Sequence, residues 1–214
     1  MRCARSMLHA GLFLLVAWLA GCATNFGPNS SKTVPPSIAG LPSEPVVSAA
    51  VQNEYVAALS AMKRSRYQEA EQTLLSLTRR YPDLSGPFAN LGIIYHRLGK
   101  LPEAAESLNK AIEINSNRAA YHNELGIVYR ESGQLEKARE SYARALRIDP
   151  LYLNSHLNIG ILYDLYLQEP GKALQYYERY QALLPAADAQ VNKWIVDLKQ
   201  RHPASDKTAF RSDK

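Results

Sequence analysis

Histidine and carboxylate side chains are the residues of this 214-residue chain that could move protons or bind a metal ion. His96, His122 and His156 are the histidine candidates, and Glu124 and Asp164 are acids that could act with them. No pair of carboxylates has the spacing of a general acid and base. The chain also holds no HExxH, GxSxG or phosphate-loop motif. The sequence therefore predicts that the protein is not an enzyme and has no catalytic residues, metal site or cofactor.

Amide and isoleucine side chains recur along the chain and could recognise a peptide without catalysis. An amide both donates and accepts hydrogen bonds, as a peptide backbone requires, and isoleucine adds apolar contact. Such a combination suits an extended or helical peptide. The recurring amide and isoleucine residues are Asn90, Ile93, Asn123, Ile127, Asn158 and Ile161.

A sequence pattern that occurs three times along the chain would position these residues. The first two copies continue with alanine, a large apolar residue and a second alanine, and each copy reads as two short helices separated by a turn. A glycine inside the first helix of each copy predicts a close helix contact. Ala104, Ala138 and Ala173 would be its small partners, while Tyr95, Tyr129 and Tyr163 fill the space between neighbouring pairs. The three copies begin as Asn90-Leu91-Gly92-Ile93-Ile94-Tyr95, Glu124-Leu125-Gly126-Ile127-Val128-Tyr129 and Asn158-Ile159-Gly160-Ile161-Leu162-Tyr163.

This 34-residue pattern resembles the tetratricopeptide repeat. The resemblance implies an all-α superhelix of about four helix-turn-helix repeats, at about 51–84, 85–118, 119–152 and 153–187. The first repeat is degenerate, as a terminal repeat is expected to be. The fourth carries one extra residue near Gln168, which predicts a distorted turn that is either a lengthened loop or a shaped contact.

A capping helix is predicted over 188–202. Asp188 is a good N-cap, and an apolar stripe runs from Val191 through Trp194 to Leu198. Pro203 stops the helix, and the polar residues 203–214 are predicted to be disordered.

In tetratricopeptide repeat proteins the first helices line a concave groove. The resemblance therefore implies that Leu59, Ile93, Ile127 and Ile161 form an apolar rail, with the three asparagines beside it bonding a peptide backbone. The alternative is that neighbouring helices cover some of these positions and that the asparagines bond only local backbone.

The N-terminus has the pattern of a secreted, lipid-anchored protein. Residues 1–21 combine Arg2 and Arg5 with a short apolar run that ends in Leu-Ala-Gly before Cys22. This resembles the lipobox of bacterial lipoproteins, which implies diacylglycerol and acyl (palmitate-type) chains on Cys22. The alternative is an ordinary secretory signal peptide with a chance cysteine. Because Cys3 would leave with the leader, no disulfide is possible within the mature chain.

The residues after Cys22 predict where the domain is held. Ala23, rather than Asp, follows the cysteine, which by analogy with enterobacterial lipoproteins implies the periplasmic face of the cell outer membrane. Residues 22–50 are rich in Gly, Asn, Ser and Pro and are predicted to be a flexible linker. About 25 such residues reach roughly 25–30 Å, so the domain would stand off the membrane.

Charge does not point to a nucleic acid. The formal net charge of +5 falls to +3 without Arg2 and Arg5, and acids are interspersed among the bases. No basic stripe with stacking aromatic residues appears, so no nucleic-acid partner is predicted.

The predicted function is that of an outer-membrane-anchored periplasmic adaptor with a protein partner in its groove. Lipoproteins of this architecture include type IV pilus pilotins, which help a secretin ring to assemble, and scaffolds that gather peptidoglycan hydrolases. An accessory of a motility apparatus is a further possibility. The contrasting class is a structural lipoprotein that forms a homodimer through its own groove.

Replacing the predicted acylated residue tests the anchor. Cys22→Ser is expected to move the protein from the membrane fraction to the soluble periplasm, because acyl chains contribute about 0.8 kcal/mol per buried methylene. Fractionation followed by immunoblotting measures this. A variant that stays in the membrane pellet would contradict the lipobox interpretation.

Overall fold

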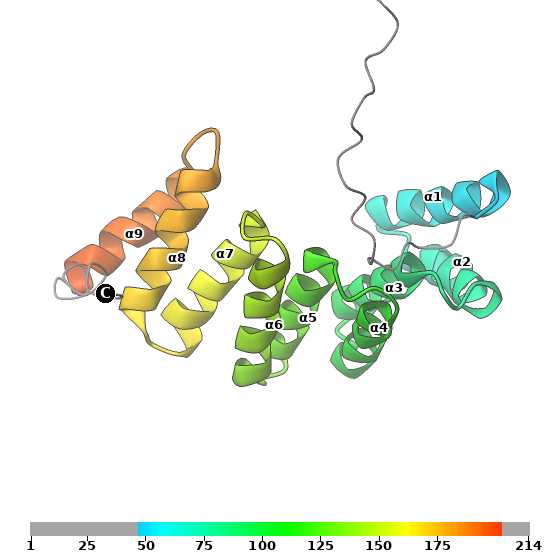
Figure 1. Ribbon diagram of the computed structural model, residues 1–214, viewed down its shortest axis with the longest axis horizontal. Coiled ribbons are helices and arrows are strands. Elements are labelled where there is room, and N and C mark those ends of the chain that lie inside the picture. The colour runs from blue at the N-terminus through cyan, green and yellow to red at the C-terminus, as the bar shows by residue number, and fades with distance from the viewer. Residues whose placement is uncertain (1–46, 203–214) are drawn as a thin grey trace, which may run out of the picture. The chain divides into compact units, whose positions relative to one another are not determined.

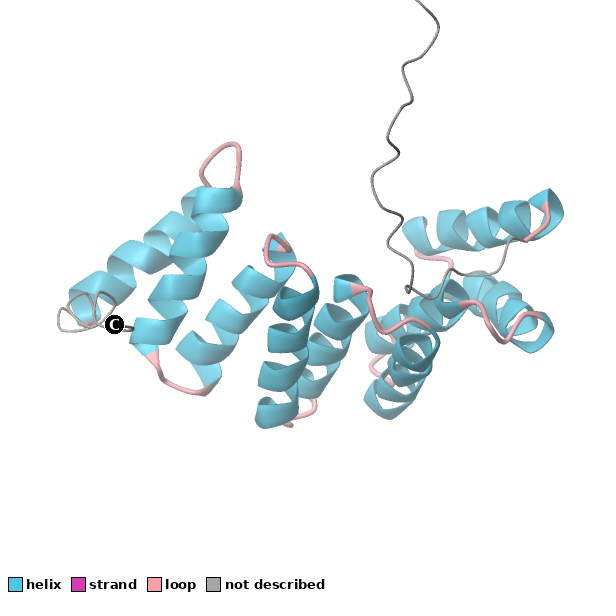
Figure 2. Cartoon of the chain, in the orientation of Figure 1, coloured by secondary structure: helices cyan, strands magenta, loops and turns pink. Residues whose placement is uncertain are grey.

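The computed structural model describes residues 47–202, in which the chain forms nine α-helices, one π-helical turn and no strand (Figure 2). The predicted signal peptide, Cys22, most of the linker and the C-terminal tail lie outside these residues. The helices are α1 (Ala49–Lys63), α2 (Tyr67–Arg80), α3 (Ser85–Arg97), α4 (Leu101–Ile114), α5 (Ala119–Glu131), α6 (Leu135–Ile148), α7 (Leu153–Ile161), η1 (Leu162–Tyr166), α8 (Pro170–Leu183) and α9 (Ala189–Arg201).

The helices pack as four pairs in chain order, followed by α9 (Figure 1). The first helix of each pair (α1, α3, α5 and α7) packs on its own second helix, and each second helix then contacts the next first helix. Each first helix also touches the following first helix. The predicted all-α fold of four helix-turn-helix repeats with a capping helix is confirmed.

Three of the four pairs are held by a large side chain of the second helix that lies on a glycine of the first, while α1 has Ala58 at the equivalent position. A Cβ added at Gly126 would stand 2.6 Å from the ring of Tyr142, and one at Gly160 would stand 2.7 Å from the ring of Tyr177. At Gly92 the side chain of Leu108 plays the same part, at 2.6 Å. The large residue, and not the small alanine, is therefore the main partner of the glycine, which corrects the sequence-based expectation.

The three alanines contribute in a different way. Ala104, Ala138 and Ala173 are completely buried, so the second helix can approach its neighbours closely. Tyr95 packs against two of the core clusters and Tyr129 does the same one repeat later. These tyrosines fill the space between neighbouring pairs, as predicted.

The turn within each repeat needs one residue of left-handed backbone. Gly99 and Gly133 have φ angles of 72° and 76°, while Ser65 and Gln168 adopt 58° and 53° at the equivalent places in the first and fourth repeats. The backbone N–H of the residue after the left-handed one donates back to the first helix, as in Lys100 N to Tyr95 O at 2.8 Å. All four pairs thus turn in the same manner.

The extra residue of the fourth repeat lies inside its first helix. The turn between η1 and α8 has three residues, 167–169, as does the turn 98–100 of the second repeat. The additional residue is absorbed by η1, where Leu167 N donates to Leu162 O, five residues back, at 3.0 Å. The expectation of a distorted turn is therefore replaced by a π-helical end to the helix.

Two histidines tie consecutive repeats together. The Nε2 atoms of His122 and His156 lie 3.0 Å from the carbonyl oxygens of Ser116 and Pro150, in the loop that precedes each repeat. Both rings are buried. Their recurrence at the same offset reflects this structural contact.

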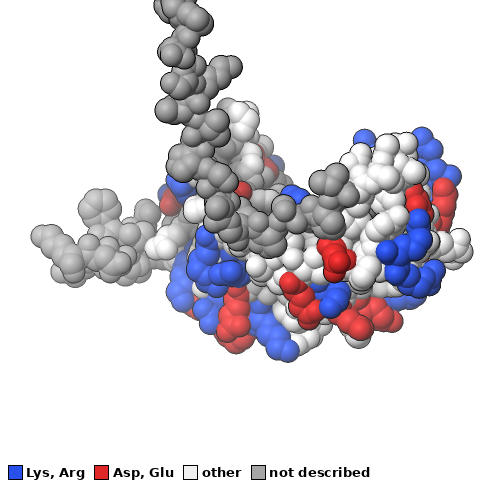
Figure 3. Space-filling model, turned by 45° about the vertical axis from the view of Figure 1, so that its right-hand side comes forward, with Lys and Arg blue, Asp and Glu red and all other residues white. Residues whose placement is uncertain are grey.

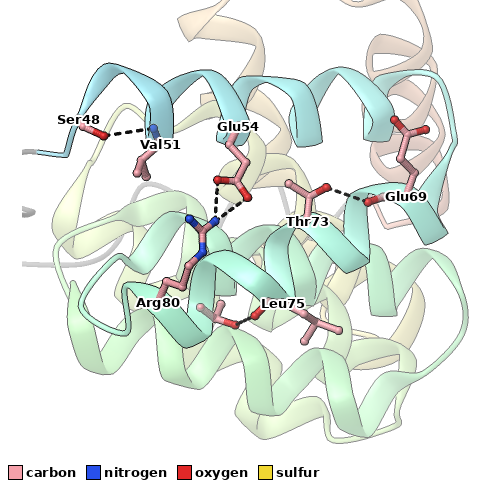
Figure 4. A network of polar contacts seen from close by, with 8 residues as sticks. Ser48, Val51, Glu54, Glu69, Thr73, Leu75 and Arg80 are labelled. Atoms are coloured by element: carbon pink, nitrogen blue, oxygen red, sulfur yellow. Dashed lines mark hydrogen bonds and ion pairs between the residues drawn. The ribbon is translucent and has the colours of Figure 1, made fainter.

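The two ends of the array are anchored by local polar contacts. At the start, Ser48 caps α1 and Arg80 of α2 bonds both carboxylate oxygens of Glu54, at 2.5 and 2.6 Å (Figure 4). At the other end, Asp188 accepts from the backbone N–H groups of Gln190 and Val191 and so begins α9. α9 then buries Val191 and Leu198 against the last pair.

Adding a methyl group to Gly126 tests the glycine contact. Gly126→Ala is expected to lower the free energy of unfolding by about 1–3 kcal/mol, because the clash with Tyr142 outweighs the gain of roughly 1 kcal/mol in helix propensity. Urea unfolding followed by circular dichroism measures this. Glu140→Ala, on the exposed side of α6, is the matched control and should stay within about 0.5 kcal/mol. A Gly126→Ala protein as stable as the parent would contradict the contact.

Candidate peptide-binding face

Equivalent positions of the four first helices form one face, which we call the first-helix face. It is defined by positions six and nine of each repeat, and these carry the predicted apolar rail. Because each first helix touches the next, the positions follow one another from repeat to repeat. The residues are Val56, Leu59, Asn90, Ile93, Glu124, Ile127, Asn158 and Ile161.

The isoleucine rail is half-buried. Ile93, Ile127 and Ile161 each keep part of their surface exposed. Ile127 and Ile161 also pack against the core cluster around Tyr142 and Ile159. The exposed parts of the isoleucines therefore offer a narrow apolar contact, while their buried parts pack against the core. The alternative that neighbouring helices cover some rail positions thus holds in part for Ile127 and Ile161.

Asn90 links the first two repeats. Its Nδ2 donates to the hydroxyl of Tyr55 on α1 at 2.6 Å and to the carbonyl of Gly86 at 2.9 Å. The amide oxygen of Asn90 accepts no hydrogen bond from residues 47–202. Asn90 thus retains one acceptor on a half-buried side chain.

Asn123 is buried and does not line an open surface, which differs from the prediction. Only 1% of its surface is exposed. Its Oδ1 accepts from Ser155 Oγ at 3.1 Å and from Asn158 Nδ2 at 3.0 Å, so it joins the third repeat to the fourth. Asn158 stays half-buried on the first-helix face with its Nδ2 occupied in this way. The physical reason is that position five points toward the next first helix rather than away from it.

Large apolar side chains are exposed at both ends of the first-helix face. Val56 and Leu59 of α1 are 61% and 36% exposed, and Leu165 and Tyr166 of η1 are 68% and 45% exposed. Sequence analysis placed only Leu59 on this face. The 34-residue spacing could have indicated Val56, which takes the position of Asn90, but Leu165 and Tyr166 owe their exposure to the π turn.

A polar border runs beside the rail at the C-terminal ends of the first helices. His96 Nε2 of α3 lies 2.8 Å from Glu131 Oε2 of α5. The guanidinium of Arg130 then lies over the ring of Tyr166, 5.8 Å from its centroid. On the side of the molecule drawn in Figure 3, Lys and Arg alternate with Asp and Glu and no region of one sign stands out.

Burial shifts the protonation of two groups near the rail toward their neutral forms. It raises the pKa of the Glu124 carboxyl, an effect that the amide of Asn123 and the positive charge of nearby His96 and Arg97 oppose. Burial likewise lowers the pKa of His122, against the hydrogen bond to Ser116.

Neither a metal-binding cluster nor a helix that could span a membrane is found among the described residues. No group of three or more His, Cys, Asp or Glu side chains within 47–202 is arranged to hold a metal ion. Across the same range, no helix has the length and apolar character to cross a bilayer.

Family comparison agrees with the repeat geometry. Two family profiles described as tetratricopeptide repeat match residues 55–119 and 89–150. The chain is a tetratricopeptide repeat protein. Proteins of this family are generally non-catalytic scaffolds, and the repeats make this chain a scaffold for protein–protein interaction. A comparison with curated proteins found no match.

Solved tetratricopeptide repeat structures share the fold. PilF of Pseudomonas aeruginosa has a TM-score of 0.66 and 22% identity over 72% of this chain and 69% of its own. MamA of Desulfovibrio magneticus RS-1 has a TM-score of 0.64 and 16% identity over 77% and 92%. YrrB, described as having an unusual peptide-binding site, has a TM-score of 0.58 and 22% identity over 69% and 75%. At these identities the likeness establishes the fold.

Removing the buried amide of Asn123 separates a structural role from a binding role. Asn123→Ala should lower the free energy of unfolding by about 1–3 kcal/mol, because it leaves the buried hydroxyl of Ser155 and the amide of Asn158 without their acceptor. Asn53→Ala, on the exposed side of α1, is the control and should stay within about 0.5 kcal/mol. Urea unfolding measures both. Unchanged stability with loss of partner binding would instead make Asn123 a ligand-contacting residue.

Proposed function

We propose that the protein is a periplasmic adaptor, anchored to the outer membrane through acylated Cys22, that binds a partner on its first-helix face during assembly of an envelope machine. The bound element is an extended peptide or a helix of the partner. The machine is a type IV pilus or secretin-like complex, or a motility apparatus.

The observation that carries the proposal is the distribution of exposed apolar surface. Val56 and Leu59 stand at one end of the first-helix face and Leu165 and Tyr166 at the other, with the half-buried isoleucines between them. Four of the seven exposed large apolar side chains among the described residues belong to the first helices of the first and last repeats, while Leu98, Leu151 and Val196 lie elsewhere. A group of exposed apolar side chains marks an interaction surface more strongly than single ones do. Contacts at both ends and in the middle suit an elongated ligand.

Several features support the envelope setting. The lipobox-like sequence before Cys22 and the Gly-, Ser- and Pro-rich residues after it suit a tethered domain. The fold shared with PilF supports comparison with proteins of the pilus system at the level of architecture. An apolar rail with one acceptor on Asn90 suits an apolar ligand whose backbone N–H groups are satisfied on binding.

Photo-crosslinking in cells tests the face and identifies the partner. A photoreactive residue at Leu165 is expected to capture a protein, whereas the same residue at Leu151 should not, because Leu151 is 59% exposed but lies between α6 and α7, off the first-helix face. Capture of a secretin or pilus subunit supports an assembly factor. A peptidoglycan hydrolase would make the protein a wall-remodelling scaffold instead, and capture of only a second copy would make it a self-associating lipoprotein.

Replacing Leu165 or Leu151 by aspartate tests the same face quantitatively. Leu165→Asp should reduce capture from a probe at Leu59 at least tenfold, because burying an unpaired carboxylate costs more than about 1.4 kcal/mol. Leu151→Asp should leave capture unchanged. Helicity measured by circular dichroism should be the same for both, since both leucines are exposed. Equal capture in the two variants would remove the first-helix face from the proposal.

A further inference from the structure

A pocket of about 500 Å³ opens where the first helices begin. Its walls come from the start of α1, the loop before α3 and the start of α5, so it spans three repeats. None of the predicted peptide-binding residues lines it. The lining residues that matter here are Val47, Val51, Tyr55, Leu84, Arg118 and Tyr121.

The pocket has an apolar floor, aromatic sides and a positive rim. Val51 and Leu84 are buried at its base, and Tyr55 and Tyr121 stand beside them. Arg118 is exposed and forms no ion pair with any residue of the range 47–202. These walls suit an apolar side chain and a proline-containing backbone with an acidic group nearby.

The chain itself enters the domain at this pocket. Val47 lines the pocket and stands directly before Ser48, the residue that caps α1. The helix that follows is fixed in place by the Arg80–Glu54 contact (Figure 4). The residues that precede Val47 therefore start at the wall of the pocket, and Leu41, six residues earlier, is at most about 20 Å of extended chain away.

We propose that residues 40–46, Gly-Leu-Pro-Ser-Glu-Pro-Val, bind in this pocket. Leu41 occupies the apolar floor and Glu44 faces Arg118. Pro42 and Pro45 favour an extended, polyproline-like backbone, which loses little entropy on binding and packs well against aromatic walls. Because the segment is joined to the domain, its effective concentration at the pocket is of millimolar order, above that of most free peptides.

The two ends of the repeat array give an independent reason. A terminal repeat needs a cover for the apolar side that a neighbouring repeat would otherwise bury. At the C-terminal end α9 provides it, while within residues 47–202 no helix precedes α1. A segment bound in the pocket adds cover beside α1, over the half-buried Val47, Tyr55 and Tyr121. The predicted linker then divides, and residues 22–39 alone act as the tether.

Intramolecular photo-crosslinking in the purified full chain tests this inference without any partner. A photoreactive residue at Gln52, an exposed residue that lines the pocket, is expected to crosslink to residues 40–46. Digestion after glutamate cuts at Glu44, so that a link between position 52 and Leu41 joins two fragments in the mass spectrum. The same probe at Asn53, next along α1 but not in the pocket lining, should give no such link.

Two substitutions show whether the proposed contacts hold the segment. Leu41→Ser and Arg118→Ala should each reduce the crosslink about tenfold or more, whereas Arg64→Ala, an exposed arginine at the end of α1, should leave it unchanged. No crosslink from position 52, an equal yield from position 53, or a yield insensitive to both substitutions would overturn the proposal. Because the experiment involves one chain only, its failure leaves the partner-binding function untouched.

Discussion

The contact between a large side chain of one helix and a glycine of its partner underlies the rest of the structure. The rings of Tyr142 and Tyr177 lie on Gly126 and Gly160, and Ala138 and Ala173 of the same second helices are completely buried. The contact recurs at Gly92, Gly126 and Gly160, so equivalent positions of these first helices recur every 34 residues. The first-helix face exists because this contact is repeated, and its spacing follows from it.

Several polar side chains form hydrogen bonds between neighbouring repeats, and this leaves few free donors and acceptors for binding a ligand. Asn123, Asn158 and Ser155 share hydrogen bonds between the third and fourth repeats, and Asn90 does so with Tyr55 between the first and second. A buried amide without a partner would cost about 1–3 kcal/mol, so these groups are satisfied within the domain. What the face presents to a ligand is consequently apolar along the isoleucines, with the amide oxygen of Asn90 and the half-buried carboxyl of Glu124 as polar groups beside them.

Irregularity at the two ends of the array shapes the candidate binding surfaces. The π turn η1 absorbs one extra residue and leaves Leu165 and Tyr166 exposed beside Arg130. At the other end the entry of the chain at Val47 leaves a pocket spanning three repeats. Regular repeats build the scaffold, and departures from regularity create its distinctive surface.

The sequence by itself determined the repeat architecture, because the spacing of glycine, alanine and large apolar residues specifies how the two helices of one repeat pack together. It also indicated the start of α9 at Asp188 and the tyrosines between repeats. Only the tertiary structure decided that Asn123 is buried, that large residues rather than alanines cover the glycines, and that the extra residue forms a π turn. These outcomes depend on the neighbouring repeat, whose side chains compete for the same space and hydrogen bonds, and no single repeat's pattern contains that information.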